Sequence, residues 1–184
     1  NGLIVREDIF KRFGVTSERD LYPAPQEFEP LDNPIPRKQH QTLLGLIFSA
    51  TSPIIIHATG GVGKTVFARQ IANSLPLGSL GIVYDCFGGG RYRNGSELRH
   101  RHRDALIQIA NELASRGLCD PLIAQSTALE DEILRKFKDR LRKAAECLKK
   151  ANKNAILSVL IDAADNAEMA AKDFSQPCFV HELL

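Results

Sequence analysis

The sequence predicts an α/β fold built on a parallel sheet. Three short apolar runs, at residues 54–57, 81–87 and 155–162, lack the alternation of a half-exposed strand, which is typical of strands covered on both faces. Segments with helical periodicity separate these runs along the chain. Strands that alternate with helices favour parallel pairing through right-handed crossovers, because consecutive parallel strands need a connection that crosses the sheet.

The first 36 residues are expected to lie outside the core domain, which we place at residues 37–184. Residues 6–14, REDIFKRFG, form a short amphipathic segment that Gly14 would end as a C-cap. Residues 21–36 contain five of the nine prolines, so they predict an extended linker or strap, because proline removes a main-chain donor and restricts the residue before it. The chain starts at Asn1 rather than Met, and we therefore expect a piece of a longer protein.

Helical periodicity accounts for most of the remaining chain. Apolar side chains recur every three or four positions from Leu129 to Leu148, which predicts a long amphipathic helix. Gly117 is placed to close another helix as a C-cap. The predicted helices cover residues 37–50, 64–75, 103–117 and 129–150, and a further helix begins in the tail at residues 179–184.

The composition narrows the classes of protein that fit. A net charge of +2, from 24 basic and 22 acidic residues, does not by itself indicate a nucleic-acid partner. The four cysteines are scattered without a Cys-x-x-Cys pair, which argues against a zinc site and a disulfide framework and favours free thiols in a reducing cytoplasm. No apolar run approaches the roughly 18 residues of a membrane span. We therefore expect a cytoplasmic protein without a membrane partner.

Residues 58–65, ATGGVGKT, carry the pattern with the most chemical information. They match G-x-x-x-x-G-K-[ST], with alanine at the first position, and they lie between a predicted strand and a predicted helix. Glycines let main-chain N–H groups touch phosphate oxygens, and the following helix directs its free N–H groups at the same place. Lys64 would contact the β- and γ-phosphates, and the Thr65 hydroxyl would bind Mg²⁺. The predicted nucleotide-binding residues here are Ala58, Thr59, Gly60, Gly61, Val62, Gly63, Lys64, Thr65 and Val66.

Two aspartates follow the third apolar run. Asp162 ends the run, and the carboxyl ends of parallel strands line the crevice where ligands bind, so Asp162 is predicted to hold Mg²⁺ directly or through water. Asp165 would orient an attacking water or act as a base. Lys64, Asp162 and Asp165 are thus the predicted catalytic residues. The plainer alternatives are a helix N-cap for Asp162 and a surface acid for Asp165.

Residues 60–65, GGVGKT, and 159–165, VLIDAAD, together resemble the STAND class of P-loop ATPases, the relatives of NACHT and NB-ARC domains. The resemblance covers about residues 35–184 and implies a P-loop NTPase fold of three α/β/α layers, incomplete at its C-terminal end. It also implies ATP or ADP and Mg²⁺ as ligands, with Arg37 near the base or the phosphates. Residues 84–113 resemble the corresponding segment of large bacterial STAND proteins, including those linked to antiphage defence.

The resemblance implies an ATP-dependent switch in bacterial signalling or defence, with slow or partner-dependent hydrolysis. An effector would precede the core, a ligand sensor would follow it, and oligomerisation would accompany activation. Asn166 stands where an acid often follows the second aspartate, with Glu168 two residues further on, which puts fast hydrolysis in doubt and leaves nucleotide binding intact. In a second departure, the sequence stops before the strand where the family carries a sensor arginine. Two alternatives stay open: a small-molecule or nucleotide kinase, and a scaffold that binds nucleotide without turnover.

A basic stretch at residues 91–103 contains five arginines and a single acid, Glu97. Such a density would suit a nucleic-acid surface, but Tyr92 is its only aromatic residue for base stacking. We therefore favour a solvated surface or a contact with another domain of a longer parent chain. In a kinase, the same arginines would form a lid over the acceptor. They are Arg91, Arg93, Arg99, Arg101 and Arg103.

Overall fold

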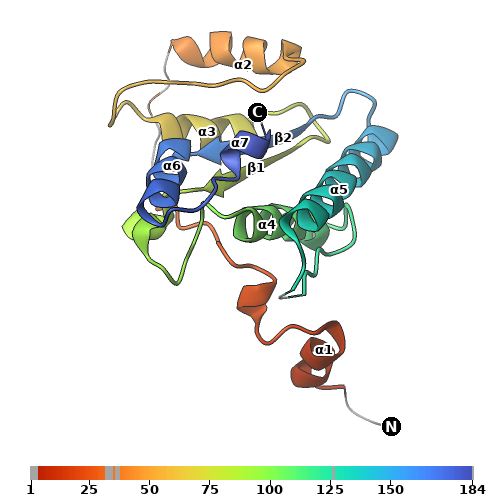
Figure 1. The fold of residues 1–184 in the computed structure, drawn as a ribbon. Helices are drawn as coiled ribbons and strands as arrows, with labels where there is room; N and C mark the ends of the chain where they lie inside the picture. The colour runs from red at the N-terminus through yellow and green to blue at the C-terminus, as the bar shows by residue number, and fades with distance from the viewer. Residues whose placement is uncertain (1–3, 32–34, 36–37, 126, 184) are drawn as a thin grey trace.

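The computed structural model describes residues 4–31, 35, 38–125 and 127–183. Its elements follow one another along the chain as helices around two strands (Figure 1). The predicted α/β class with parallel pairing is confirmed at this level. The elements are α1 (Arg6–Phe13), the 3₁₀ turn η1 (Glu18–Asp20), α2 (Gln39–Ser49), α3 (Lys64–Asn73), β1 (Leu80–Asp85), the 3₁₀ segment η2 (Gly88–Arg93), α4 (His102–Ser115), α5 (Glu130–Ala151), β2 (Leu157–Asp162), α6 (Ala164–Asp173) and α7 (Val180–Leu183).

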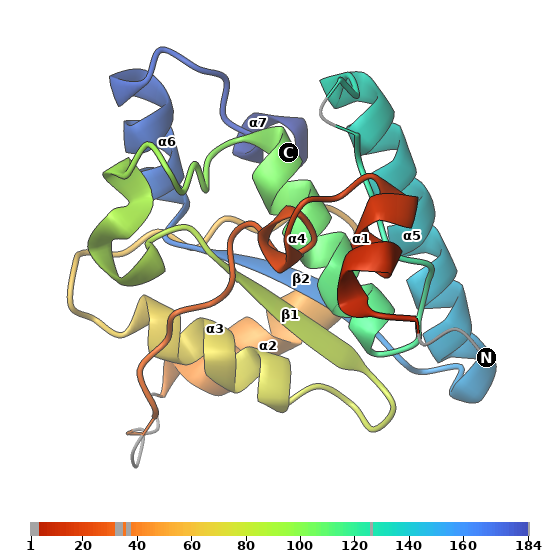
Figure 2. The same ribbon diagram turned by 90° about the horizontal axis from the view of Figure 1, so that it is seen from below.

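The two strands pair in parallel and in register. Leu80 lies opposite Leu157, and the pairing continues to Asp85 opposite Asp162, so two carboxylates stand side by side at the carboxyl end of the sheet. Figure 1 shows α3 on one face of the strands and α4 with α5 on the other, while α2 lies beyond α3. Seen from below, α4 crosses in front of the strands (Figure 2). This arrangement brings the start of α3 to the same end of the sheet as the two carboxylates.

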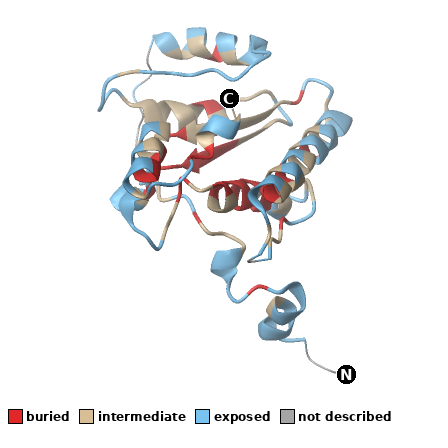
Figure 3. Cartoon of the chain, in the orientation of Figure 1, coloured by how far each residue is buried: buried red, intermediate tan, exposed pale blue. Residues whose placement is uncertain are grey.

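The hydrophobic core lies between the sheet and the α4–α5 pair. Figure 3 shows the buried residues gathered in β1, in α4 and along one side of α5, with exposed surface over α1 and most of α2. Tyr84 of β1 packs edge-on against Phe179, with ring centroids 5.3 Å apart. Phe137 of α5 is fully buried in the same cluster. Aromatic pairs of this kind add to the stability that their buried area already provides.

The first predicted strand, residues 54–57, is not a strand in the structure. Ile54, Ile55 and Ile56 are all exposed, Ile55 by 75%, and their main chain makes no hydrogen bond to a neighbouring strand among the described residues. An apolar run has the composition of a buried strand, but a strand also needs a neighbouring strand to pair its main-chain hydrogen bonds. None of the described segments pairs with residues 54–57. His57 is also exposed.

The glycine-based helix ends are confirmed. Gly14 ends α1 with a φ of 67°. Gly117, with a φ of 72°, follows α4, and its N–H donates to the carbonyl of Ala114 while the N–H of Leu118 donates to that of Leu113, which is a Schellman ending. Leu129 does not join the buried stripe of α5, because it is the N-cap residue and is 74% exposed. The sequence did not lead us to predict α6.

None of the helices in the described ranges combines the length and the apolar character that a membrane crossing needs. The described part of the predicted linker or strap, residues 21–31 and 35, has no helix or strand. Residues 22–29, which we call the strap, run beside β1 and α3 towards α2 (Figure 2). Ala24 within it is 1% exposed, and its N–H donates to the Gln108 side chain of α4 at 3.0 Å. This segment is therefore part of the wall of the molecule rather than a free linker.

Candidate functional site

The loop at residues 58–65, which we call the glycine loop, turns directly into α3. Gly61 and Gly63 have φ values of 75° and 91°, in the left-handed region that favours glycine. A Cβ atom at either position would meet nothing within 4 Å, so the backbone angle rather than space requires glycine. Gly63 is the N-cap of α3, which leaves the first N–H groups of the helix without partners inside the helix.

Lys64 folds back over the glycine loop. Its Nζ donates to the carbonyl oxygen of Ala58 at 2.8 Å and to that of Thr59 at 3.0 Å. Lys64 is half-buried and is the first residue of α3, whose first N–H groups have no partner inside the helix. One flexible cation and several main-chain donors thus face the same region.

Thr65 and Asp162 meet across the site although they are far apart in the sequence. The Thr65 hydroxyl donates to a carboxylate oxygen of Asp162 at 2.8 Å. Asp162 is 7% exposed, and burial raises the pKa of its carboxyl above the ordinary value of 3.8, with the neighbouring Asp85 charge adding to the rise. The hydrogen bond from Thr65 opposes this shift by stabilising the ionised form.

These groups line one cavity of about 380 Å³, within the size range of small-molecule sites. Asp165 is exposed in the first turn of α6 and also faces the cavity, beside Asn166. Glu168 pairs instead with His181 of α7, so it points elsewhere. The lining residues are Glu27, Phe28, Gly60, Gly61, Lys64, Thr65, Asp85, Phe87, Asp162, Ala163, Asp165 and Asn166.

The remaining predicted binding residues lie beside this cavity or cannot be placed. Ala58, Thr59, Val62, Gly63 and Val66 are not among its lining residues. Ala58 and Thr59 contribute through the carbonyls that hold Lys64, and Gly63 contributes as the N-cap of α3. Val62 is 42% exposed. Arg37 lies outside the described residues.

Six lining residues were not predicted as site residues from the sequence. Two of them, Ala163 and Asn166, adjoin the predicted aspartates, and the other four lie far from the predicted motifs. Glu27 and Phe28 come from the strap, and Asp85 and Phe87 come from the end of β1 and the turn after it. Asp85 is 2% exposed and ends β1 as Asp162 ends β2, but the predicted strand continued to Phe87, which placed Asp85 inside the run rather than at its end. No local sequence pattern distinguishes Glu27 and Phe28, because they lie at the cavity only as a result of the course that the strap takes in the fold.

The arginines at 91–103 do not form one solvated surface. Arg99 is 0% exposed, which contradicts that reading for this residue. Arg91 pairs with Glu27 and Glu97, and Arg93 pairs with Asp173. Arg101 pairs with Asp104, and Arg103 donates to the carbonyls of Ala124 and Gln125. Across the described part of the chain, no arginine lines the cavity of the glycine loop.

The donor set fits a hard cation bound together with phosphate. Mg²⁺ prefers oxygen ligands, keeps several waters, and is commonly held by one or two protein oxygens plus substrate phosphates. The Thr65 hydroxyl and the Asp162 carboxylate supply such a pair within one cavity. Among the described side chains, no group of three or more His, Cys, Asp or Glu residues is arranged to hold a metal by itself.

No protein-family model matches this chain, and no curated protein is similar to it. The functional conclusion therefore depends on the geometry of the cavity.

The raised pKa of Asp162 predicts how its replacement changes stability with pH. A carboxyl whose pKa is raised in the folded state favours the neutral form there, so its ionisation costs stability as pH rises from about 3.8 through the raised pKa. Asp162→Asn removes that cost and keeps an oxygen acceptor for Thr65. We expect the variant to be more stable than the wild type at neutral pH and equally stable in strong acid, as measured by urea unfolding at a series of pH values. A stability difference that did not change with pH would contradict this.

Proposed function

We propose that the chain is the nucleotide-binding core of an ATP-dependent molecular switch, a P-loop ATPase of the STAND type. The observation that carries the proposal is the 2.8 Å hydrogen bond between Thr65 and Asp162, in a cavity that Lys64 also lines. Residues 97 positions apart in the sequence thus present a cation, a hydroxyl and a carboxylate to one space.

A triphosphate is the ligand that uses all of these groups. The free N–H groups at the start of α3 and the positive end of the helix dipole favour an anion beside the glycine loop. The Nζ of Lys64, now hydrogen-bonded to two loop carbonyls, would exchange those neutral acceptors for phosphate oxygens, which form stronger bonds with an ammonium group. The lysine would then neutralise charge on the β- and γ-phosphates.

Thr65 and Asp162 would hold the Mg²⁺ that accompanies the nucleotide. The cation would stabilise the negative charge that develops on the phosphate oxygens during hydrolysis. Asp162 must be ionised for this role. The cation would favour ionisation and oppose the effect of burial on the pKa of Asp162. Nucleotide affinity is therefore expected to depend on magnesium through these two residues.

The residues beside Asp165 at the rim of the cavity would favour slow hydrolysis of a bound triphosphate. Asp165 is exposed at the rim and is the candidate to orient an attacking water, whereas its neighbour Asn166 carries no charge and Glu168 is engaged with His181. A kinase lid is not supported, because the arginines at 91–103 are paired elsewhere or buried. Slow turnover suits a switch, because the conformation of a switch depends on which nucleotide is bound and not on how fast nucleotide is hydrolysed.

Calorimetric titration with ATP tests the proposal, in magnesium and then in EDTA. We expect the wild type to bind ATP and to bind it more tightly with magnesium, and we expect Asp162→Asn to remove most of that magnesium-dependent gain. Asp139→Asn, at a half-exposed acid of α5 that does not line the cavity, is the matched control and should behave as the wild type. Equal losses with and without magnesium would contradict the metal role of Asp162, and absence of ATP binding to the wild type would contradict the proposal as a whole.

A further inference from the structure

The strap forms part of the nucleotide cavity and is attached to it through buried polar groups. Glu27 and Phe28 line the cavity together with Lys64 and Thr65. The N–H of Glu27 donates to a carboxylate oxygen of Asp85 at 3.1 Å, and the same carboxylate accepts from the N–H groups of Phe87 and Gly88 through its other oxygen. Asp85 thus joins the strap to the turn that follows β1.

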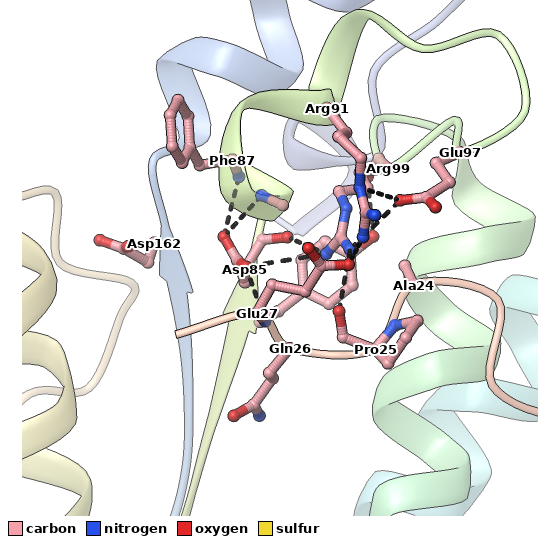
Figure 4. Close-up of polar contacts among 12 residues, drawn as sticks. Ala24, Pro25, Gln26, Glu27, Asp85, Phe87, Arg91, Glu97, Arg99 and Asp162 are labelled. Carbon is pink, nitrogen blue, oxygen red and sulfur yellow. Dashed lines mark hydrogen bonds and ion pairs between the residues drawn. The ribbon is translucent and has the colours of Figure 1, made fainter. Parts of the chain in front are cut away.

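Arg99 is the second attachment, and it is unusual because its charge is fully buried. It donates to the carbonyl of Asp85 and to that of Pro25 in the strap, each at 2.9 Å. Figure 4 shows Arg99 among the carboxylates of Glu27, Asp85 and Glu97, with Asp162 on the other side of Asp85. The nearest ion-pair distances are 3.4 Å to Glu27, 3.6 Å to Glu97 and 3.8 Å to Asp85.

The turn after β1 is shaped to admit this arginine. Gly88 has a φ of 56°, and a Cβ atom at this position would lie 2.1 Å from the Nε of Arg99. A buried guanidinium must be paired to be tolerated, and the strap supplies two of the partners of Arg99, the Pro25 carbonyl and the Glu27 carboxylate. Undocking of the strap would leave the cation short of partners.

The strap also covers the edge of β1 that β2 does not occupy. The side chain of Gln26 donates to the carbonyl of Val83 at 2.6 Å and to Glu112 of α4 at 3.2 Å. Arg69 of α3 donates to the carbonyl of Glu29 and lies over the ring of Phe28. The strap is therefore held by the same two elements, β1 and α3, that carry the cavity.

We propose that Arg99 and Asp85 are positioning residues that hold the strap as a wall of the nucleotide cavity, so that docking of the strap and binding of Mg·ATP favour each other. The proposal rests on the proposed function for the identity of the ligand. A docked strap places Glu27 and Phe28 at the cavity, and a ligand that fills the cavity favours the docked state, because a ligand shifts an equilibrium towards the state that it binds better. Binding linkage is reciprocal, so each event must change the other by the same factor.

Hydrogen exchange and binding measurements test this coupling on the full chain. We expect a slowly hydrolysed ATP analogue with Mg²⁺ to slow exchange of the strap amides, including those of Ala24 and Glu27. In the same experiment, the amides of residues 118–125 should not respond. The expected coupling is about five-fold or more, the lower end of typical couplings between sites.

Two variants loosen the strap at residues that do not themselves line the cavity. Gln26→Ala removes the bonds to Val83 and Glu112, and Arg99→Lys keeps the charge but loses the planar fork that spans two carbonyls. We expect both to lower affinity for the magnesium–analogue complex, by at most the factor seen in exchange. Arg103→Lys is the matched control, because Arg103 likewise binds two carbonyls of a loop but that loop does not line the cavity.

The outcomes separate the coupling from the proposed function. If the wild type binds the analogue while strap exchange and the affinity of Gln26→Ala and Arg99→Lys stay unchanged, the coupling is wrong and the nucleotide site stands. If the wild type does not bind the analogue, the proposed function is wrong and the coupling falls with it. Should Arg99→Lys fail to fold, Gln26→Ala alone decides, since Gln26 is not a buried charge.

Discussion

Replacing Lys64 with alanine is expected to lower the affinity of the chain for Mg·ATP by about ten-fold or more. Hydrogen bonds to charged groups contribute about 1.5–3 kcal/mol, and each 1.4 kcal/mol is ten-fold in a binding constant. Lys64 is the only lysine that lines the cavity among the described residues. The measurement is calorimetric titration of the variant and the wild type at one salt concentration, because screening weakens interactions between charges.

The effect on binding should greatly exceed the effect on folding. In the absence of ligand, Lys64 holds only the carbonyls of Ala58 and Thr59, which lie at the surface and can bond to water instead. Urea unfolding of Lys64→Ala should therefore resemble that of the wild type. Lys172→Ala, at an exposed lysine in the last turn of α6, is the control for the general loss of a positive charge. Equal ATP affinity in Lys64→Ala and the wild type would remove the glycine loop from the site.

The parts of the site predicted from the sequence are those in which one short segment already specifies the chemistry. Lys64 and Thr65 follow a glycine loop at the start of a helix, and Asp162 ends an apolar strand, so the local pattern fixed their positions. The parallel pairing of β1 with β2 then brings Asp162 to Thr65. Asp85 ends β1 as Asp162 ends β2, but the apolar run at 81–87 continues through Cys86 and Phe87, so the sequence did not place Asp85 at the end of a strand.

The parts that could not be predicted depend on long-range pairing. Residues 54–57 have the composition of a buried strand, yet pairing is decided by a neighbour that no local pattern identifies, and here the isoleucines are exposed. The strap reaches the cavity through a bond between Glu27 and Asp85, which are 58 residues apart. Charge density likewise could not separate Arg99 from the other arginines around it. The feature that distinguishes Arg99 is structural: the missing side chain of Gly88 makes room for its guanidinium.

The close contact between α3 and β1 explains how a small part of the fold can align the whole site. Thr65 sits on α3, and Asp85 and Asp162 sit on the strands, so the distance between helix and sheet sets the Thr65–Asp162 hydrogen bond. Gly81 of β1 lies at that contact. A Cβ atom there would be 2.5 Å from the Cα of Ala72 and 2.6 Å from its Cβ. The nearest atom belongs to the main chain, so the clash cannot be relieved by turning a side chain.

Gly81→Ala is therefore expected to destabilise the chain by about 3 kcal/mol, the upper part of the range for overpacking a well-packed interior. The helix must move away from the sheet, which lengthens the Thr65–Asp162 contact, so the affinity for Mg·ATP should fall as well. Gly45→Ala, in the middle of α2, is the matched control, because a Cβ atom there meets nothing within 4 Å and alanine in a helix is favoured over glycine by roughly 0.5–1 kcal/mol. Urea unfolding should show opposite signs for the two variants. A Gly81→Ala chain as stable as the wild type would mean that α3 can shift from the sheet at little cost, and the alignment of Thr65 with Asp162 would then need another source.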